Sequence, residues 1–206
     1  MSRRSKSNRW RTAQEKDTYV RRARTEGWRS RAVFKLEEID KKHNLIRPGM
    51  TVVDLGAAPG GWSQYAAYRL KGSGLLVALD LLPMDRLPDV EFIQGDFEDD
   101  TVVNQLMNIL EKRPVDLVMS DMAPNISGMR VVDQPRSMAL AEVARELAFD
   151  VLAPGGTFIA KLFHGEGFDE FVRESRAHFR SVAVKKPAAS RPSSRETYLV
   201  ARNYRV

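Results

Sequence analysis

Two acidic residues close successive β-rich runs of the sequence. Asp80 ends an apolar run, and Asp96 lies within a Gly-Asp-Phe triplet after the next run. A carboxylate at a strand end can accept hydrogen bonds from both hydroxyls of a ribose, which is the role we expect for Asp80. Asp96 can accept from an adenine amino group, with Phe97 beside the ring. Either acid alone is weak evidence, because a strand-end aspartate is often only a helix cap.

A turn of small residues precedes both acids and joins a predicted strand to a predicted helix. It spans residues 54–62 and contains Gly56, Gly60 and Trp62. Such a turn lets the backbone approach a ligand closely at the carboxyl edge of a sheet. The G-x-G-x-x-G pattern of dinucleotide enzymes is absent, which disfavours a nucleotide-dependent oxidoreductase. A simple tight turn is the alternative, but the two acids follow at the expected places. Together the three strand ends predict a pocket for an adenosine and a sulfonium.

Asp121 follows a fourth β-rich run and precedes Met-Ala-Pro-Asn. Methyltransferases that act on exocyclic base nitrogens commonly carry Asn/Asp-Pro-Pro-aromatic at this point. Those that attack a pyrimidine ring use a cysteine, and the chain has none. We therefore expect a hydroxyl as the methyl acceptor.

Two further charged residues are expected beside Asp121. Lys161 interrupts an apolar strand, where a lysine is costly unless it lies at the open end with a partner. Glu196 opens the last strand, and an antiparallel last strand would bring it to Asp121 and Lys161. Lys35 interrupts an apolar helix face and by itself would be interpreted as a solvated lysine. Lys161 is the candidate to take the hydroxyl proton, or, if charged, to orient the hydroxyl's lone pair.

Strand and helix patterns alternate around these residues. β-rich runs at 51–55, 75–80, 90–94, 115–120 and 157–163 enclose helical spacing within 62–70, 103–110 and 140–151. The alternation predicts a Rossmann-like α/β fold, a mostly parallel sheet with helices on both faces. The final runs, 181–185 and 197–201, have only a loop between them and predict an antiparallel hairpin. We expect about seven strands with the last one reversed, and an additional helix over 31–42.

The charge is unevenly distributed along the chain. Residues 1–35 carry twelve Lys/Arg and three Asp/Glu, residues 36–182 fifteen and twenty-three, and residues 183–206 six and one. Basic ends on an acidic body suit a polyanion such as RNA, and Trp10, Tyr19 and Trp28 add stacking faces. Solvated tails are the alternative. We expect a basic, flexible arm at 1–20 and a single catalytic domain at 21–206.

Several classes of protein are excluded by composition. Without cysteine, the chain has no disulfide, cysteine-rich zinc site or thiolate nucleophile, and we predict no metal. The first residues are too polar for a signal peptide, and no apolar run approaches the roughly 20 residues of a membrane span. We expect a soluble, cytoplasmic protein.

The segments that carry these residues resemble the FtsJ family (RrmJ, RlmE) of ribosomal RNA large-subunit 2′-O-methyltransferases. The resemblance covers nearly all of residues 28–201, with the matching motifs at 29–35, 54–64, 80–85, 94–97, 119–125, 165–170 and 194–196. It implies a Lys-Asp-Lys-Glu catalytic tetrad at Lys35, Asp121, Lys161 and Glu196. It implies S-adenosyl-L-methionine binding at Gly60, Trp62, Asp80, Asp96 and Asp121.

The resemblance also implies a substrate. The expected target is a uridine ribose in the A loop of 23S rRNA, on the assembled or nearly assembled large subunit. No obligatory protein partner is evident, so we expect a monomer. Enzymes that methylate tRNA or the mRNA cap at the same oxygen are the nearest alternatives. A ribosome assembly factor that binds RNA without catalysis is another, but the chain retains every tetrad residue.

Overall fold

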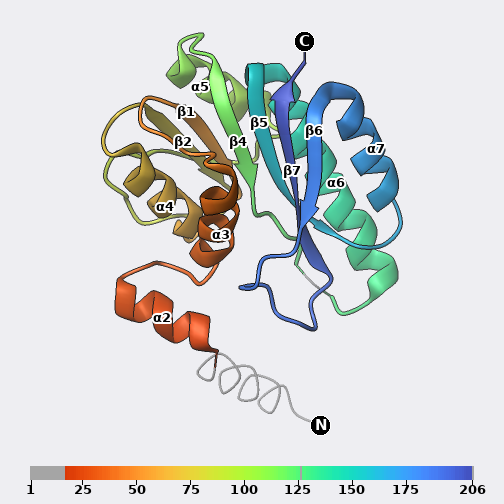
Figure 1. The fold of residues 1–206 in the computed structure, drawn as a ribbon. Helices are drawn as coiled ribbons and strands as arrows, with labels where there is room; N and C mark the ends of the chain where they lie inside the picture. Colours follow the sequence, from red (N-terminus) through yellow and green to blue (C-terminus); the bar gives the residue numbers. More distant parts are fainter. Residues whose placement is uncertain (1–16, 126, 206) are drawn as a thin grey trace.

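The computed structural model describes residues 17–125 and 127–205. Most of the predicted arm, residues 1–16, lies outside the described residues. The described chain forms a central sheet with helices on both sides (Figure 1). The strands are β1 (Thr51–Leu55), β2 (Leu75–Asp80), β3 (Glu91–Gln94), β4 (Val115–Ser120), β5 (Leu152–Phe163), β6 (Phe179–Lys185) and β7 (Glu196–Tyr204). The helices are α2 (Thr18–Glu26), α3 (Val33–His43), α4 (Gly61–Leu70), α5 (Asp100–Leu110), α6 (Arg130–Val151) and α7 (Phe168–His178).

The sheet has seven strands in the order β3-β2-β1-β4-β5-β7-β6. Strands β1 to β5 pair in parallel, whereas β7 is antiparallel to both of its neighbours. The prediction of seven strands with only the last reversed is confirmed. The order changes direction between β1 and β4, and ligands of open α/β sheets bind at the carboxyl ends of the strands beside such a point.

Each face of the sheet is buried against its own set of helices. Apolar residues of α2, α3 and α4 form one core with side chains such as Val52 and Ile159. Residues of α5, α6 and α7 form the other core, with Val53 and Phe158. Consecutive strand residues alternate between the two cores because side chains of a strand point to opposite faces. Burial on both faces explains why the strands are nearly continuous apolar runs.

Two of the helices in the described residues were not predicted from the sequence. Helix α7 buries Phe168, Phe171, Val172 and Ser175, a helical spacing that its many charged residues obscure. Helix α2 begins at Thr18, after an N-cap in which Asp17 accepts from the Tyr19 N–H. Its first three residues therefore fall within the segment predicted as an arm.

Some predicted boundaries also moved. Helix α3 begins at Val33 rather than at residue 31, and β5 begins at Leu152 rather than at 157. The early start of β5 includes Gly155 and Gly156, which normally indicate a turn. The pairing register with β4 is irregular between Val115 and Leu117. Tertiary pairing thus extends a strand through residues with little intrinsic strand preference.

Candidate active site

A pocket of about 660 Å³ opens at the carboxyl edge of the sheet. Five of the predicted site residues line it: Gly56, Asp80, Asp96, Phe97 and Asp121. The ends of β1, β2, β3 and β4 thus converge as predicted, and Arg136 and Leu140 of α6 line the pocket from the side. Gly56 has a φ of 73°, and an added Cβ there would overlap the Met122 side chain. Glycine is required at this turn for both its conformation and its size.

The Asp80 carboxylate fixes the loops around the pocket. One of its oxygens accepts from the Ala58 N–H at 2.8 Å, and the other accepts from the Leu82 N–H at 2.7 Å. A carboxylate has about four lone-pair positions, so each oxygen retains capacity for a ligand hydroxyl. Asp80 therefore supports the turn after β1 and faces the pocket as well.

Asp96 and Phe97 form the far wall of the pocket. Asp96 accepts from the Glu98 N–H at 3.0 Å through one oxygen and is exposed to solvent. The Phe97 side chain is buried at 9% exposure and belongs to the core on the α5 side. A rigid apolar ring next to an accessible carboxylate is suited to a planar base with an amino group.

Gly60 and Trp62 lie at the start of α4 and, unlike the other predicted cofactor residues, are not among the residues that line the pocket. Gly60 has a φ of 102° and is buried. The Trp62 indole N–H donates to the Ala32 carbonyl at 2.9 Å, and its ring lies 5.6 Å from that of Tyr198. In the described structure Trp62 thus connects the start of α4 with the N-cap residue of α3 and with β7.

Asp54 is a further acid at this edge, at the start of the small-residue turn. It is 1% exposed, and its Oδ2 accepts from the Ser63 hydroxyl at 2.6 Å. Its Oδ1 is buried without a hydrogen-bond partner among the described residues. Burial, and then the negative charges of Asp121 and Asp80, raise the pKa of Asp54 to about 7 despite the Ser63 hydrogen bond.

Asp121 and Lys161 form an ion pair where the pocket meets β5. The Lys161 Nζ lies 3.2 Å from Asp121 Oδ1 and donates to the Asp121 backbone carbonyl at 2.5 Å. The Lys161 side chain is 7% exposed and that of Asp121 is 17% exposed. The strand lysine is thus at the open end with a partner, as expected.

Lys35 and Glu196 form a second ion pair, at 2.8 Å. Their side chains are 12% and 13% exposed. The Ser190 hydroxyl donates to the same Glu196 oxygen at 2.7 Å. Glu196 was predicted to lie beside Asp121 and Lys161, but its ionic partner is Lys35 of α3, and Asp121 pairs with Lys161 instead.

Tyr198 connects the two ion pairs and was not predicted from the sequence as a site residue. Its hydroxyl donates to Asp121 Oδ1 at 2.6 Å and accepts from the Lys35 Nζ at 3.0 Å. Tyr198 stands opposite Lys161 in the β5–β7 register, two residues after Glu196. The period of two along a strand, applied to Glu196, would have placed Tyr198 on the same face.

The electrostatics of this cluster keep Asp121 ionised. Burial would raise the pKa of the Asp121 carboxyl, but Lys161, Lys35 and the Tyr198 hydroxyl together hold it below the ordinary value. Burial, followed by the charges of Asp121 and Glu196, raises the pKa of Tyr198 well above its ordinary value. Tyr198 therefore keeps its proton and can act as a donor to Asp121.

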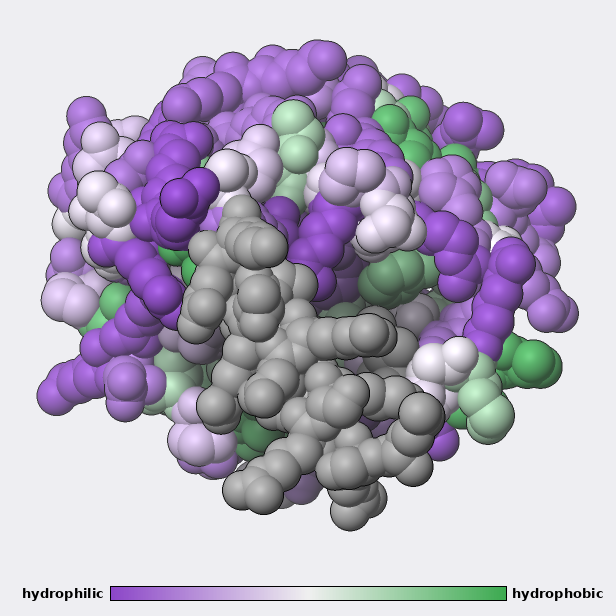
Figure 2. All heavy atoms as spheres, turned by 90° about the horizontal axis from the view of Figure 1, so that it is seen from below, coloured by the Kyte–Doolittle hydropathy of each residue, from purple (hydrophilic) through white to green (hydrophobic). Residues whose placement is uncertain are grey.

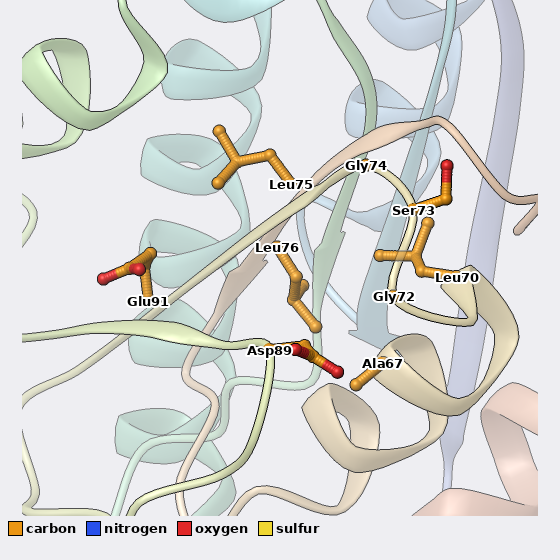
Figure 3. A pocket seen from close by; sticks show the side chains of 9 residues that line it. All are labelled: Ala67, Leu70, Gly72, Ser73, Gly74, Leu75, Leu76, Asp89 and Glu91. Atoms are coloured by element: carbon orange, nitrogen blue, oxygen red, sulfur yellow. The ribbon is translucent and has the colours of Figure 1, made fainter.

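Arg29 is another residue that the sequence analysis did not single out. Its guanidinium donates to the carbonyls of Pro59, Asp85 and Arg86, at 3.3, 2.7 and 2.9 Å. It thereby connects the turn before α4 with the loop after β2. A second, smaller pocket of about 160 Å³ lies at the opposite, amino edge of the sheet, between α4 and the start of β2 (Figure 3). It contains none of the predicted site residues.

The strand order, the reversed β7 and the pocket at the carboxyl edge define a Rossmann-like methyltransferase fold. Comparison with known proteins makes the assignment specific. The sequence model of the FtsJ-like methyltransferase family matches residues 28–204. The chain belongs to this family, which confirms the resemblance seen in its motifs.

Relatives match over the full length. The chain is 57% identical over 206 residues to "Ribosomal RNA large subunit methyltransferase E" of Legionella pneumophila (strain Corby), covering 100% of both chains. It is 56% identical over 202 residues to the protein of the same name from Alkalilimnicola ehrlichii, covering 98% of this chain and 97% of that one. A crystal structure described as a ribosomal RNA methyltransferase from Plasmodium falciparum has a TM-score of 0.78 at 30% identity, covering 86% of this chain and 98% of that one.

Proposed function

We propose that this methyltransferase uses S-adenosyl-L-methionine to methylate the ribose 2′-hydroxyl of a uridine in 23S rRNA. The proposed nucleotide lies in the A loop of the assembled or nearly assembled large subunit. The observation that carries the chemistry is the Lys161–Asp121 pair at the inner end of the pocket, next to the Lys35–Glu196 pair. The curated relatives named for the large-subunit RNA support the substrate.

The pocket fits the proposed cofactor. Asp80 and Asp96 offer carboxylate oxygens to ribose hydroxyls and an adenine amino group, and Phe97 offers an apolar surface to the base. The carboxylates of Asp80, Asp96 and Asp121 line the pocket and give it a negative potential. S-adenosylmethionine carries both a sulfonium and an ammonium, which suit this potential, and it supplies the methyl group.

Lys161 is the residue that we place at the acceptor hydroxyl. The 2′-oxygen bonds to the methyl carbon while the carbon–sulfur bond breaks, and the hydroxyl loses its proton. A neutral Lys161 would accept that proton; a charged Lys161 would orient the oxygen lone pair while the proton leaves to water or a carboxylate. In both cases Asp121 fixes the Nζ through two contacts. Alignment of oxygen, methyl carbon and sulfur supplies much of the acceleration.

The surface around the site suits a polyanion. Figure 2 looks onto the carboxyl edge of the sheet, where hydrophilic residues predominate among the coloured atoms. Exposed arginines lie on α2 (Arg21 and Arg24) and in the β6–β7 loop that leads to Glu196 (Arg191 and Arg195). Asp17, the N-cap of α2, connects the two segments, because its carboxylate lies 3.8 Å from the Arg191 Nε of the loop. The same carboxylate also pairs with Arg31. RNA phosphates are natural partners for these arginines.

The basic residues 1–16 precede α2 directly, and we assign them to RNA contacts as well. The tetrad comes entirely from one chain, which is consistent with a monomer. Ribosomal RNA as the substrate would place the enzyme in the cytoplasm. No helix among residues 17–125 and 127–205 is long and apolar enough to cross a membrane.

A folded rRNA element offers shape, 2′-hydroxyls and splayed loop nucleotides in a fixed arrangement. We therefore expect the large subunit or a late precursor to accept methyl groups faster than a naked transcript does. The test is mass mapping of RNA from cells with and without the enzyme, complemented by purified protein on subunits. The expected result is the loss of one 2′-O-methyluridine in large-subunit rRNA. A loss confined to tRNA or mRNA would contradict the substrate and retain only the chemistry.

A further inference from the structure

We infer that Tyr198 is a positioning residue for methyl transfer, whose hydroxyl holds the Asp121 carboxylate in place relative to Lys35 and so aims Lys161. The inference rests on the proposed function, because it assigns Lys161 to the acceptor hydroxyl. Tyr198 itself is 0% exposed and is not among the residues that line the pocket. Its effect therefore has to pass through its neighbours.

The position of the hydroxyl is fixed from two sides. Antiparallel pairing sets Tyr198 directly opposite Lys161, so the two side chains share the sheet face that α3 covers. The tyrosine ring packs against Trp62 with centroids 5.6 Å apart and an interplanar angle of 40°. A buried ring between a strand and an indole has little rotamer freedom, so its hydroxyl is preorganised.

The hydrogen bonds of that hydroxyl form a directed chain. Lys35 donates to it at 3.0 Å, and it donates to Asp121 Oδ1 at 2.6 Å. The same Oδ1 lies 3.2 Å from the Lys161 Nζ. Tyr198 and Lys161 thus share one carboxylate oxygen. The tyrosine hydrogen bond selects the orientation in which this oxygen meets the lysine.

The Tyr198 hydroxyl also lies between the charged groups of Lys35 and Asp121 and forms a hydrogen bond with each. Lys35 has Glu196 as its ionic partner at 2.8 Å, while Asp121 has Lys161. A neutral group between Lys35 and Asp121 satisfies one proton of the ammonium and one lone pair of the carboxylate. Removal of the hydroxyl would leave both groups short of a partner in a largely buried site, where charged groups bind hydrogen-bond partners most strongly.

A substitution that removes only the Tyr198 hydroxyl can separate its packing role from its positioning role. Tyr198→Phe retains the ring against Trp62 and removes only the hydroxyl. Tyr204→Phe is a matched control on the same strand, since the Tyr204 hydroxyl donates to the Phe149 carbonyl at 3.2 Å at the far end of β7. Tyr198→Phe loses the hydrogen bonds to Asp121 and from Lys35, whereas Tyr204→Phe loses one bond outside the tetrad.

We expect Tyr198→Phe to lower the single-turnover rate of methyl transfer by about tenfold or more, the effect of losing a hydrogen bond to a charged group. The dissociation constant for S-adenosylmethionine should stay within about twofold of that of the wild type, and Tyr204→Phe should match the wild type in both. Carbon NMR of the carboxyl groups, with Asp121→Asn to assign the signal, gives a second readout. Loss of the donor should raise the pKa of Asp121 in Tyr198→Phe alone.

Each outcome decides the inference. A Tyr198→Phe rate within about twofold of the wild type would overturn it. A slow variant with an unchanged Asp121 pKa would show that the loss does not pass through the Asp121 carboxylate, and would also overturn it. Lys161→Met, tested in parallel, reports on the proposed function: if that variant transfers methyl at the full rate, the role of Lys161 fails. The NMR titration would still show whether Tyr198 positions Asp121.

Discussion

The cofactor pocket and the acceptor cluster are assembled in different ways. The pocket is organised by short connections at the ends of β1, β2 and β3, and Asp80 contacts the backbone of residues only 2 and 22 positions away. The cluster combines side chains of α3, β5 and β7 with the residue after β4. Its contacts join residues separated by 40, 77 and 163 positions. The pocket is therefore assembled from the ends of neighbouring parallel strands with α6, whereas the acceptor cluster also needs α3 and the antiparallel β7.

The two regions also differ in charge. In the cluster, Lys35 and Lys161 balance Asp121 and Glu196 in two ion pairs. The pocket is lined by the carboxylates of Asp80, Asp96 and Asp121, and the charges of Asp121 and Asp80 contribute to the raised pKa of the buried Asp54. The acceptor cluster is thus electrostatically complete in the protein alone, while the pocket is complementary to a cation.

The largest expected effect separates chemistry from binding. Lys161→Met should lower methyl transfer by about a thousandfold or more, because it removes the group at the acceptor hydroxyl. S-adenosylmethionine affinity, measured by calorimetry, should stay within a few fold. Lys41→Ala is the control, since Lys41 is a surface lysine paired with Glu37. If Lys161→Met instead lost cofactor binding and retained its rate at saturation, Lys161 would belong to the binding pocket and not to the acceptor site.

The pH dependence of the wild-type rate can distinguish the two roles of Lys161. If Lys161 is a neutral base, the wild-type rate should rise with pH along a single titration, with chemistry shown to limit the rate. A flat profile from about pH 6 to 9 would support the orienting role.

Asp54→Asn should change the pH dependence of stability. The pKa of Asp54 is raised in the folded protein from 3.8 to about 7, chiefly by burial. Between these values the folded state holds a proton that the unfolded state releases, so this group's contribution to stability falls as pH rises. Above about pH 7, the wild type should have lost up to about 4 kcal/mol of its free energy of unfolding. Asp54→Asn has no proton to lose at this position, so its free energy of unfolding should not fall in this way. Urea unfolding at acidic and alkaline pH tests this, and parallel curves for both proteins would contradict it.

Asp80→Ala should weaken cofactor binding by about 2 kcal/mol or more, roughly thirtyfold, because a charged acceptor of two hydroxyls is lost. Asp96→Ala is the matched comparison, since Asp96 is exposed and accepts from only one backbone N–H in the described structure. We expect a smaller loss there. Calorimetry on folded Asp80→Ala that gave wild-type affinity would remove Asp80 from the binding site.

The sequence predicted the fold better than its details. The bounds of β1, β2 and β4 are as predicted, because buried parallel strands leave short apolar runs with clear ends. Helix α7 was missed because only four of its residues are buried and charged residues surround them. The start of β5 was missed because Gly155 and Gly156 resemble a turn, and only the pairing of Leu152 with Val115 of β4 decides otherwise.

For the site, the sequence by itself determined which residue types stand at each strand end, and hence the pocket lined by Gly56, Asp80, Asp96 and Phe97. These positions follow from the end of a strand and the start of a loop, which are local properties. Only the tertiary structure decided that Lys35 pairs with Glu196 and that Tyr198 joins this pair to Asp121. The partners come from elements far apart in the chain, and strand register and helix packing, rather than sequence spacing, set which side chains meet.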